Sequence, residues 1–298
     1  MKTKLLRGKP VAEHVKNDLA EKIKILQNNS IIPGLAAILV GDDPASKVYV
    51  KSKSKAFQEN GCHSETHILS KDSSEEDILN LISGLNNNDK IHGILVQLPL
   101  PKHLNSKKIL NSVDPNKDVD GFHPLNLGSL LEGSPNFIPC TPNGIIEILK
   151  FYDIETSGRH VVIVGRSNIV GKPMFALLSQ KFKVGNSTVT MCHTGTDDIS
   201  KYTKIADIII AAVGVPEMIT ADMIKNDCCI IDVGINRIDD ESRDKGYRLV
   251  GDVDRNSVLG KAASITPVPG GVGPMTITML LYNTVKSAFS YSKLGLFK

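Results

Sequence analysis

Residues 160–194 constrain the fold of this chain more than any other stretch. Residues 160–164 are a short β-branched run that ends at Gly165, a pattern typical of a buried parallel strand. Gly165 and Gly171 flank a turn, and Pro173 suits the first position of a helix. A second apolar run then ends at Cys192. This order of strand, turn, helix and strand predicts a parallel α/β sheet.

The turn after Gly165 is a candidate phosphate site, because a helix N-terminus presents backbone N–H groups and a partial positive charge. Its glycine spacing is not G-x-G-x-x-G, so the glycines alone carry little weight. A cofactor with a free ribose 2′-hydroxyl usually meets an Asp or Glu near the end of the second strand. The chain has none there before Asp197, and Arg166 lies in the turn, which favours NADP over NAD. The alternative is an ordinary strand–turn–helix with a solvated arginine.

The composition excludes several classes of protein. At 298 residues the chain is long enough for two domains, and a net charge of +3 gives no basic face for nucleic acid. No apolar run approaches the roughly 18 residues of a membrane span, and the N-terminus lacks the apolar core of a secretory signal. The five cysteines are odd in number and show no C-x-x-C spacing, which indicates reduced thiols in a cytoplasmic protein and no metal site.

Strands and helices alternate in both halves of the chain, which predicts an α/β fold with mostly parallel sheets. Ser73 and Glu76 resemble a capping box that begins a helix over residues 75–85. The polar residues 239–246 are expected to form a hairpin loop.

Tyr49 and Lys53 share one face of a predicted helix, because they are four residues apart. A phenol ring beside an ammonium group can stack on a flat ligand and transfer protons. The alternative is a solvated basic face that Lys53 forms with Lys47, Lys51 and Lys55. The spacing alone leaves both interpretations open.

Gln97 and a cluster of aspartates are further candidates. Gln97 lies near the end of the apolar run 91–98, where a buried amide needs hydrogen-bond partners unless it faces solvent at the strand end. Asp114, Asp118 and Asp120 lack the glycine and the terminal glutamate of an EF-hand loop. We expect one of these carboxylates to recognise N–H donors of a substrate, and a surface turn is the alternative.

Residues 265–274 combine three prolines with three glycines directly before a predicted helix. Prolines stiffen a backbone and glycines permit positive φ or close approach, a combination that a plain connector rarely needs. We therefore expect a ligand-contacting loop rather than a linker. Two X-Pro bonds, Leu98-Pro99 and Val268-Pro269, are candidates for cis peptides.

Together these segments closely resemble the bifunctional methylenetetrahydrofolate dehydrogenase/methenyltetrahydrofolate cyclohydrolase family. The matching stretches are residues 40–46 with Tyr49 and Lys53, then 93–101, 117–121, 165–173, 232–237 and 265–276. They occur in the family's order along nearly the whole chain, and the last of them is highly specific. Thr194 stands where a serine is frequent, and both residues offer a hydroxyl.

The resemblance implies two α/β domains with mostly parallel sheets and an interdomain cleft. The first, a folate-binding catalytic domain, would comprise residues 1–145 and 275–298. The second, a Rossmann-like NADP-binding domain, would comprise residues 146–274. NADP is the implied cofactor, and tetrahydrofolate derivatives are the implied substrates, held in the cleft with the one-carbon bridge facing the nicotinamide. The resemblance further implies a cytoplasmic homodimer that acts in one-carbon metabolism and purine biosynthesis, with no nucleic-acid or membrane partner.

The resemblance also assigns roles to residues. Tyr49 would stack on the folate rings, Lys53 would carry the proton chemistry, Gln97 would orient Lys53, and Asp120 would accept hydrogen bonds from the pterin's amino edge; these four are the predicted catalytic residues. The further predicted folate contacts are Val96, Leu98, Pro269, Gly270, Gly271, Val272, Gly273, Pro274 and Ile277. The predicted NADP contacts are Gly165, Arg166, Ser167, Val170, Gly171, Thr194 and Ile235.

The implied reaction is the NADP-dependent oxidation of 5,10-methylenetetrahydrofolate to 5,10-methenyltetrahydrofolate, followed by hydrolysis to 10-formyltetrahydrofolate. Two other interpretations remain open. Another NADP-linked dehydrogenase, acting on a small hydroxy or amino acid, would explain residues 160–235 but would leave Tyr49, Lys53 and Asp120 without a shared purpose. A non-catalytic regulator would bind NADP without turnover.

Overall fold

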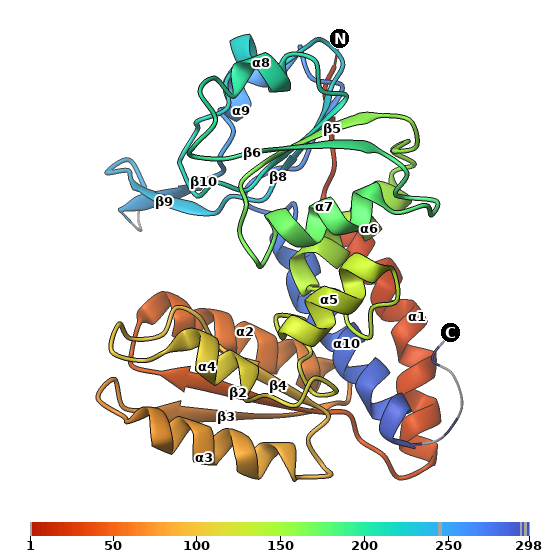
Figure 1. The fold of residues 1–298 in the computed structure, drawn as a ribbon, viewed down its shortest axis with the longest axis vertical. Helices are drawn as coiled ribbons and strands as arrows, with labels where there is room; N and C mark the ends of the chain where they lie inside the picture. The colour runs from red at the N-terminus through yellow and green to blue at the C-terminus, as the bar shows by residue number, and fades with distance from the viewer. Residues whose placement is uncertain (1, 244–245, 293, 295–296, 298) are drawn as a thin grey trace. The chain divides into compact units, whose positions relative to one another are not determined.

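The computed structural model describes residues 2–243, 246–292, 294 and 297 (Figure 1). Its chain divides into two units, each with its own sheet. Unit 1 comprises Met1–Glu13 and Thr141–Thr276, and unit 2 comprises His14–Cys140 and Ile277–Lys298. Three helices have residues in both units: α1 (Gly8–Asn28), α6 (Cys140–Phe151) and α10 (Gly273–Ser292).

The six-stranded sheet of unit 1 is parallel throughout, in the order β1-β11-β8-β7-β5-β6. Its strands are β1 (Lys4–Leu5), β5 (His160–Val164), β6 (Thr188–Cys192), β7 (Ile208–Ala211), β8 (Cys229–Asp232) and β11 (Ser264–Ile265). The chain steps from β5 to β6 in one direction and continues through β7 and β8 in the other. In such sheets a ligand binds at the carboxyl ends of the strands where the direction reverses, here beside β5.

Apolar strands explain why this sheet is buried on both faces. Every residue of β7 and β8 is buried, as continuous β-branched runs require of a covered parallel sheet. Helix α7 (Gly171–Ser179) packs against β5 and β6. The remaining elements of unit 1 are α8 (Ser200–Thr203), α9 (Arg255–Val258) and a 3-10 helix (Ala221–Met223), with the antiparallel pair β9 (Asn236–Asp239) and β10 (Tyr247–Val250). The expected hairpin at residues 239–246 is thus confirmed, although residues 244–245 lie outside the described residues.

Unit 2 holds a three-stranded parallel sheet in the order β3-β2-β4. Its strands are β2 (Gly34–Val40), β3 (His63–Leu69) and β4 (Gly93–Val96), and its own helices are α2 (Pro44–Glu59), α3 (Glu75–Asn86), α4 (Ser106–Asn111) and α5 (Pro124–Glu132). Figure 1 shows α2 and α3 against opposite faces of this sheet. Ile38, Ile78, Ile82 and Ile94 form part of the core under α3. The predicted α/β fold with mostly parallel sheets is confirmed in both units.

Two local predictions are wrong. Helix α3 is capped by Ser74 with Asp77 rather than by Ser73 with Glu76, because Ser74 Oγ accepts from Asp77 N at 3.1 Å and the Asp77 carboxylate accepts from Ser74 N at 3.0 Å. Pro173 is the third residue of α7 and not the first.

Residues 1–13 also fall in unit 1, whereas the sequence analysis placed them with the folate-binding domain. The reason is the two-residue strand β1, which pairs with β11 through Lys4 opposite Ser264 and Leu5 opposite Ile265. None of the helices in the described part of the chain has the length and apolar character that crossing a bilayer requires.

Candidate active site

Helix α2 carries Tyr49 and Lys53, and its sequence explains their placement. Asp43 caps the helix by accepting a hydrogen bond from Ser46 N at 2.7 Å. Val50, Lys53 and Phe57 follow one another at spacings of three and four, so they form the buried face of this amphipathic helix. Lys53 is only 5% exposed. It therefore does not belong to a solvated basic face.

Lys53 lies between the side chains of Gln97 and Tyr49. Its Nζ donates a hydrogen bond to Gln97 Oε1 at 3.1 Å and lies 5.0 Å from the centroid of the Tyr49 ring. Gln97 Nε2 donates to Leu98 O at 2.8 Å, which turns the amide oxygen toward the lysine. Gln97 N donates to Ile38 O at 2.9 Å and so ties the end of β4 to β2. The alternative of a solvent-facing glutamine at the strand end does not hold.

Asp120 is the fourth member of this cluster. Burial raises the pKa of the Asp120 carboxyl, while the Lys53 ammonium and a hydrogen bond with the Cys140 thiol act in the opposite direction. Burial and the neighbouring Asp120 carboxylate raise the pKa of Cys140 well above its ordinary value. The structure thus brings together all four predicted catalytic residues within unit 2.

Two residues that were not singled out from the sequence hold the backbone next to Asp120. Asn283 of α10 is 1% exposed, and its Nδ2 donates to Val119 O at 2.8 Å and to Ile138 O at 3.0 Å. Cys140 Sγ donates to Val119 O at 3.2 Å. Asn283 could have been noticed as a polar residue among the apolar positions of the last predicted helix. Nothing in the sequence around Cys140 predicted this contact, since Cys140 was considered only as one of the five cysteines.

The three aspartates of the acidic cluster have different surroundings. Asp118 is buried, and its carboxylate accepts hydrogen bonds from three donors: Phe122 N, His123 N and Asn126 Nδ2. Burial raises the pKa of Asp118 to about 7 against the effect of these bonds. The Asp114 carboxylate accepts from Asn116 N at 2.8 Å in a local turn. Burial raises the pKa of Asp120 and the Lys53 ammonium opposes this rise, so these two charges lie close enough to interact.

The turn after β5 in unit 1 depends on its glycines for backbone packing. A Cβ on Gly165, whose φ is +126°, would lie 2.2 Å from Ala212 O, and a Cβ on Gly171 would lie 2.2 Å from Gly165 O. Arg166 is exposed, and its Nη2 donates to Thr194 Oγ1 at 3.4 Å. Two predicted NADP contacts, one after β5 and one after β6, therefore lie together at the carboxyl ends of neighbouring strands.

The first turn of α7 is a poorer phosphate receptor than the sequence predicts. Val170 N and Gly171 N both donate to Ser167 Oγ, at 3.1 and 3.4 Å, and Lys172 N donates to Ser167 O at 3.0 Å. Pro173 has no N–H group to offer. The expectation of free backbone donors at these positions is wrong, because Ser167 already satisfies them.

The proline- and glycine-rich loop is tightly packed within unit 1. Gly8 N donates to Gly270 O at 2.9 Å, and a Cβ on Gly8 would lie 1.9 Å from Gly271 O. A Cβ on Gly273 would lie 3.6 Å from Ile235 Cδ1, so the loop adjoins a predicted NADP contact. Both candidate X-Pro bonds are cis. Of the predicted folate contacts, Pro269, Gly270, Gly271, Val272, Gly273 and Pro274 belong to unit 1, and Val96, Leu98 and Ile277 belong to unit 2.

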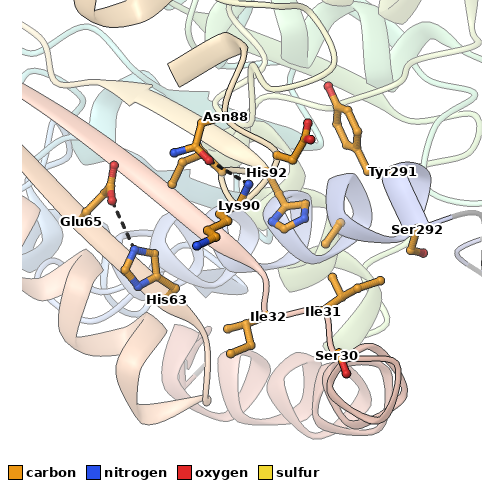
Figure 2. Close-up of a pocket in the computed structure, with 13 residues that line it drawn as sticks. Ser30, Ile31, Ile32, His63, Glu65, Asn88, Lys90, His92, Tyr291 and Ser292 are labelled. Carbon is orange, nitrogen blue, oxygen red and sulfur yellow. Dashed lines mark hydrogen bonds and ion pairs between the residues drawn. The ribbon is translucent and has the colours of Figure 1, made fainter. Parts of the chain in front are cut away.

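Unit 2 also has a cavity of about 730 Å³ near the amino ends of β3 and β4. Figure 2 shows Ile31, Ile32, His63, His92 and Tyr291 around it, and no predicted site residue lines it. Burial lowers the pKa of His92 to about 4, and the Lys117 ammonium adds to this effect. No group of three or more His, Cys, Asp or Glu side chains suited to a metal ion occurs among the described residues.

Two family models match the chain. The tetrahydrofolate dehydrogenase/cyclohydrolase catalytic domain matches residues 6–120, and the tetrahydrofolate dehydrogenase/cyclohydrolase NAD(P)-binding domain matches residues 139–292.

Curated relatives and solved structures agree with these models. The bifunctional protein FolD of Chlorobium chlorochromatii is 54% identical over 286 residues, covering 95% of this chain and 97% of the relative. The FolD crystal structure from Campylobacter jejuni has a TM-score of 0.91 at 48% identity, covering 97% of this chain and 99% of that one. The Trypanosoma brucei FolD structure, complexed with NADP cofactor and inhibitor, has a TM-score of 0.92 at 35% identity, covering 99% and 100%. This chain therefore belongs to the tetrahydrofolate dehydrogenase/cyclohydrolase family.

Proposed function

We propose that this protein oxidises 5,10-methylenetetrahydrofolate to 5,10-methenyltetrahydrofolate with NADP⁺ and then hydrolyses the methenyl bridge to 10-formyltetrahydrofolate. The observation that carries the proposal is the Lys53 cluster: a buried ammonium 3.1 Å from Gln97 Oε1 and 5.0 Å from the Tyr49 ring centroid, with the Asp120 carboxyl nearby. Membership of the family supplies the substrate class.

Each side chain of the cluster has a task in this chemistry. Tyr49 is half-buried and offers its ring for stacking on the folate. Asp120 accepts hydrogen bonds from the amino edge of the pterin, which fixes the substrate's orientation.

Lys53 carries the proton transfers of the hydrolytic step. Water that adds to the methenyl carbon must lose a proton, and a folate nitrogen must gain one before the bridge opens to the formyl group. Gln97 holds the lysine at the reacting centre through its amide oxygen, because the amide nitrogen is engaged by Leu98 O.

The carboxyl edge of the unit 1 sheet fits NADP. Arg166 and Ser167 are exposed there, Arg166 reaches Thr194, and the cationic side chain suits a 2′-phosphate. Bound NADP⁺ supplies the hydride acceptor for the oxidation. The exposed Ile235, 53% accessible, offers an apolar contact at the end of β8.

The test is a methenyl absorbance assay with 5,10-methylenetetrahydrofolate and NADP⁺, using reactions without NADP⁺ and with small hydroxy or amino acids as controls. We expect methenyltetrahydrofolate to appear and then to be converted to 10-formyltetrahydrofolate. Turnover of a hydroxy or amino acid instead would establish another dehydrogenase. Binding of NADP⁺ without turnover of any substrate would establish a regulator.

The same proposal includes the protein's setting. We propose a homodimer formed through the NADP-binding domain, in a reducing cytoplasm where it supplies formyl groups for purine biosynthesis. All five cysteines are buried and free, in line with a reducing compartment. Light scattering coupled to gel filtration tests the assembly, and a mass of one 32.3 kDa chain would contradict it.

A further inference from the structure

Two buried carboxylates lie at the carboxyl edge of the unit 1 sheet without an assigned role. Asp232, the last residue of β8, is 3% exposed, and Asp252, which follows β10, is fully buried. No lysine or arginine in the described part of the chain forms an ion pair with either. A buried carboxylate is tolerated only when hydrogen bonds satisfy its oxygens.

Asp252 joins the loops that follow two neighbouring strands. Its Oδ2 accepts hydrogen bonds from Val213 N at 2.7 Å and Gly214 N at 3.0 Å, in the loop after β7. Its Oδ1 accepts from Asn236 Nδ2 at 2.9 Å, directly after Ile235. One carboxylate therefore joins the start of the loop after β7 to Asn236, the residue that ends the loop after β8. Backbone bonds hold the rest of the loop after β7, from Glu217 N to Gly251 O at 3.0 Å and from Ile219 N to Asp252 O at 2.9 Å.

Asp232 in turn fixes the backbone that carries Asp252. Its Oδ1 accepts from Asp252 N at 2.9 Å and Gly234 N at 3.1 Å, and its Oδ2 accepts from Val253 N at 3.2 Å. Asp232 N donates to Thr266 Oγ1 at 2.7 Å. Thr266 directly follows β11, so this bond links Asp232 to the end of the neighbouring strand.

Two glycines make room for the carboxylates. A Cβ on Gly234 would lie 2.2 Å from Asp252 Oδ1, and a Cβ on Gly251 would lie 1.7 Å from Asp232 Oδ2. Neither position can take a side chain without displacing a carboxylate oxygen. The local backbone is therefore built around the two acids.

The loops held by Asp252 adjoin the groups expected to bind NADP. The loop after β8 carries the exposed Ile235. The loop after β7 begins at Ala212, whose carbonyl oxygen would lie 2.2 Å from a Cβ on Gly165, at the turn that bears Arg166. A shift of either loop would move the surface on which the nucleotide lies.

We propose that Asp252, oriented by Asp232, is a positioning residue for the dehydrogenase reaction: it holds the loops after β7 and β8 in the arrangement that binds NADP. The inference rests on the proposed function. It predicts that loss of Asp252 impairs NADP binding and oxidation but spares methenyl hydrolysis, which Lys53 and its neighbours perform in unit 2.

The test uses Asp252→Asn, with Asp254→Asn as its matched control. Asp254 is two residues away, and its side chain caps α9 by accepting from Asn256 N and Ser257 N. Its contact with the segment after β7 is a backbone bond, from Asp254 N to Ile219 O at 2.8 Å, which the substitution keeps. An amide at position 252 keeps one acceptor and cannot accept from both loops. We expect the dissociation constant for NADP⁺, measured by calorimetry, to rise at least tenfold in Asp252→Asn and less than twofold in Asp254→Asn. Methenyl hydrolysis, assayed without NADP⁺, should stay within twofold of the parent in both.

Two further variants keep the inference falsifiable. In Asp252→Asn/Asn236→Asp the amide at 252 can donate to the new carboxylate at 236 and still accept from the loop after β7, so NADP⁺ binding should be restored. If Asp252→Asn does not fold, Asn236→Ala is the second variant, because it removes only the bond to Asp252 Oδ1. It should also weaken NADP⁺ binding. Parallel loss of both activities, or unchanged NADP⁺ affinity, would overturn the inference. A parent protein that turns over neither folate would instead overturn the proposed function.

Discussion

At the residue scale, burial separates Lys53 from the other lysines of its helix. Lys47, Lys51 and Lys55 are exposed, whereas Lys53 is 5% exposed and donates to Gln97. A lysine held among an amide, a phenol ring and a carboxyl in this way is placed for proton transfer rather than for solubility. The neighbouring lysines provide matched controls for it on the same helix.

Asp120→Asn should weaken folate binding. The substitution removes the charge that accepts the pterin's N–H donors, which costs about 1–3 kcal/mol for a lost charged hydrogen bond. We expect the Michaelis constant for 5,10-methylenetetrahydrofolate to rise accordingly, while Asp114→Asn, in its local turn, leaves it unchanged. Equal Michaelis constants for Asp120→Asn and the parent would count against a role in substrate binding.

Arg166→Ser should erode the preference for NADP over NAD, because the guanidinium is the cation offered to the 2′-phosphate. Arg159→Ser, at the exposed residue just before β5, is the control. The ratio of kcat/KM for the two nucleotides measures the effect. A ratio that Arg166→Ser leaves unaltered would remove the argument for NADP specificity.

His92 should make the protein sensitive to acid. Its pKa is lowered from 6.5 to about 4, and its Nδ1 accepts a hydrogen bond from Gly34 N at 3.1 Å, so the folded protein holds it neutral. As the pH falls from 6.5 through 4, the unfolded chain takes up the proton first, and the free energy of unfolding decreases. His92→Asn keeps an acceptor but does not titrate in this range.

Urea denaturation of the parent and His92→Asn over this range of pH tests the histidine. We expect the parent to lose stability relative to the variant on acidification and their difference to be constant above pH 7. A difference that does not depend on pH would show that His92 is not held neutral by the fold.

At the element scale, helix α3 shows how a cap is chosen. Ser73 and Ser74 can both cap a helix, but the structure pairs Ser74 with Asp77, whose carboxylate accepts a hydrogen bond from Ser74 N. Ser74→Ala should lower the free energy of unfolding by about 1 kcal/mol. Ser73→Ala should leave it nearly unchanged, and equal effects of the two substitutions in urea denaturation would contradict this assignment.

The predicted elements succeeded where their signal was long and apolar. The apolar runs at 160–164 and 91–98 predicted strands, and the structure has strands at His160–Val164 and Gly93–Val96. Their β-branched residues suit a covered parallel sheet. Strand β1 was missed because two residues carry no periodicity and depend on β11, more than 250 residues later. The donors at the start of α7 were misjudged because capping by Ser167 depends on the shape of the turn.

At the scale of the whole molecule, the candidate site residues could be predicted from the sequence, but the contacts that position them could not. Tyr49, Lys53, Gln97 and Asp120 could be proposed because the resemblance assigned their roles, and the structure brings them together. Asn283 and the Asp232–Asp252 pair were not singled out, since their partners lie on segments distant in sequence. Such contacts depend on how separate segments of the chain pack together in the fold, which a local sequence pattern does not predict.

The division of predicted residues between the units has a functional consequence. The four predicted catalytic residues belong to unit 2, and the predicted NADP contacts belong to unit 1. In the proposed reaction, hydrolysis needs the folate with Lys53 and its neighbours, whereas oxidation needs NADP⁺ as well. Loss of an NADP contact in unit 1 should therefore impair oxidation and spare hydrolysis. The proton chemistry proposed for unit 2 is tested most directly at Lys53.

That measurement is the rate of 5,10-methenyltetrahydrofolate hydrolysis by Lys53→Met, with Lys51→Met as the exposed control on α2 and NADP⁺ affinity measured in parallel. General acid–base groups contribute about 10²–10⁴-fold to rate. We predict a loss of at least about 100-fold in Lys53→Met, with unchanged NADP⁺ affinity and normal hydrolysis in Lys51→Met. Hydrolysis by Lys53→Met at the parent rate would contradict the central claim that Lys53 performs the proton chemistry.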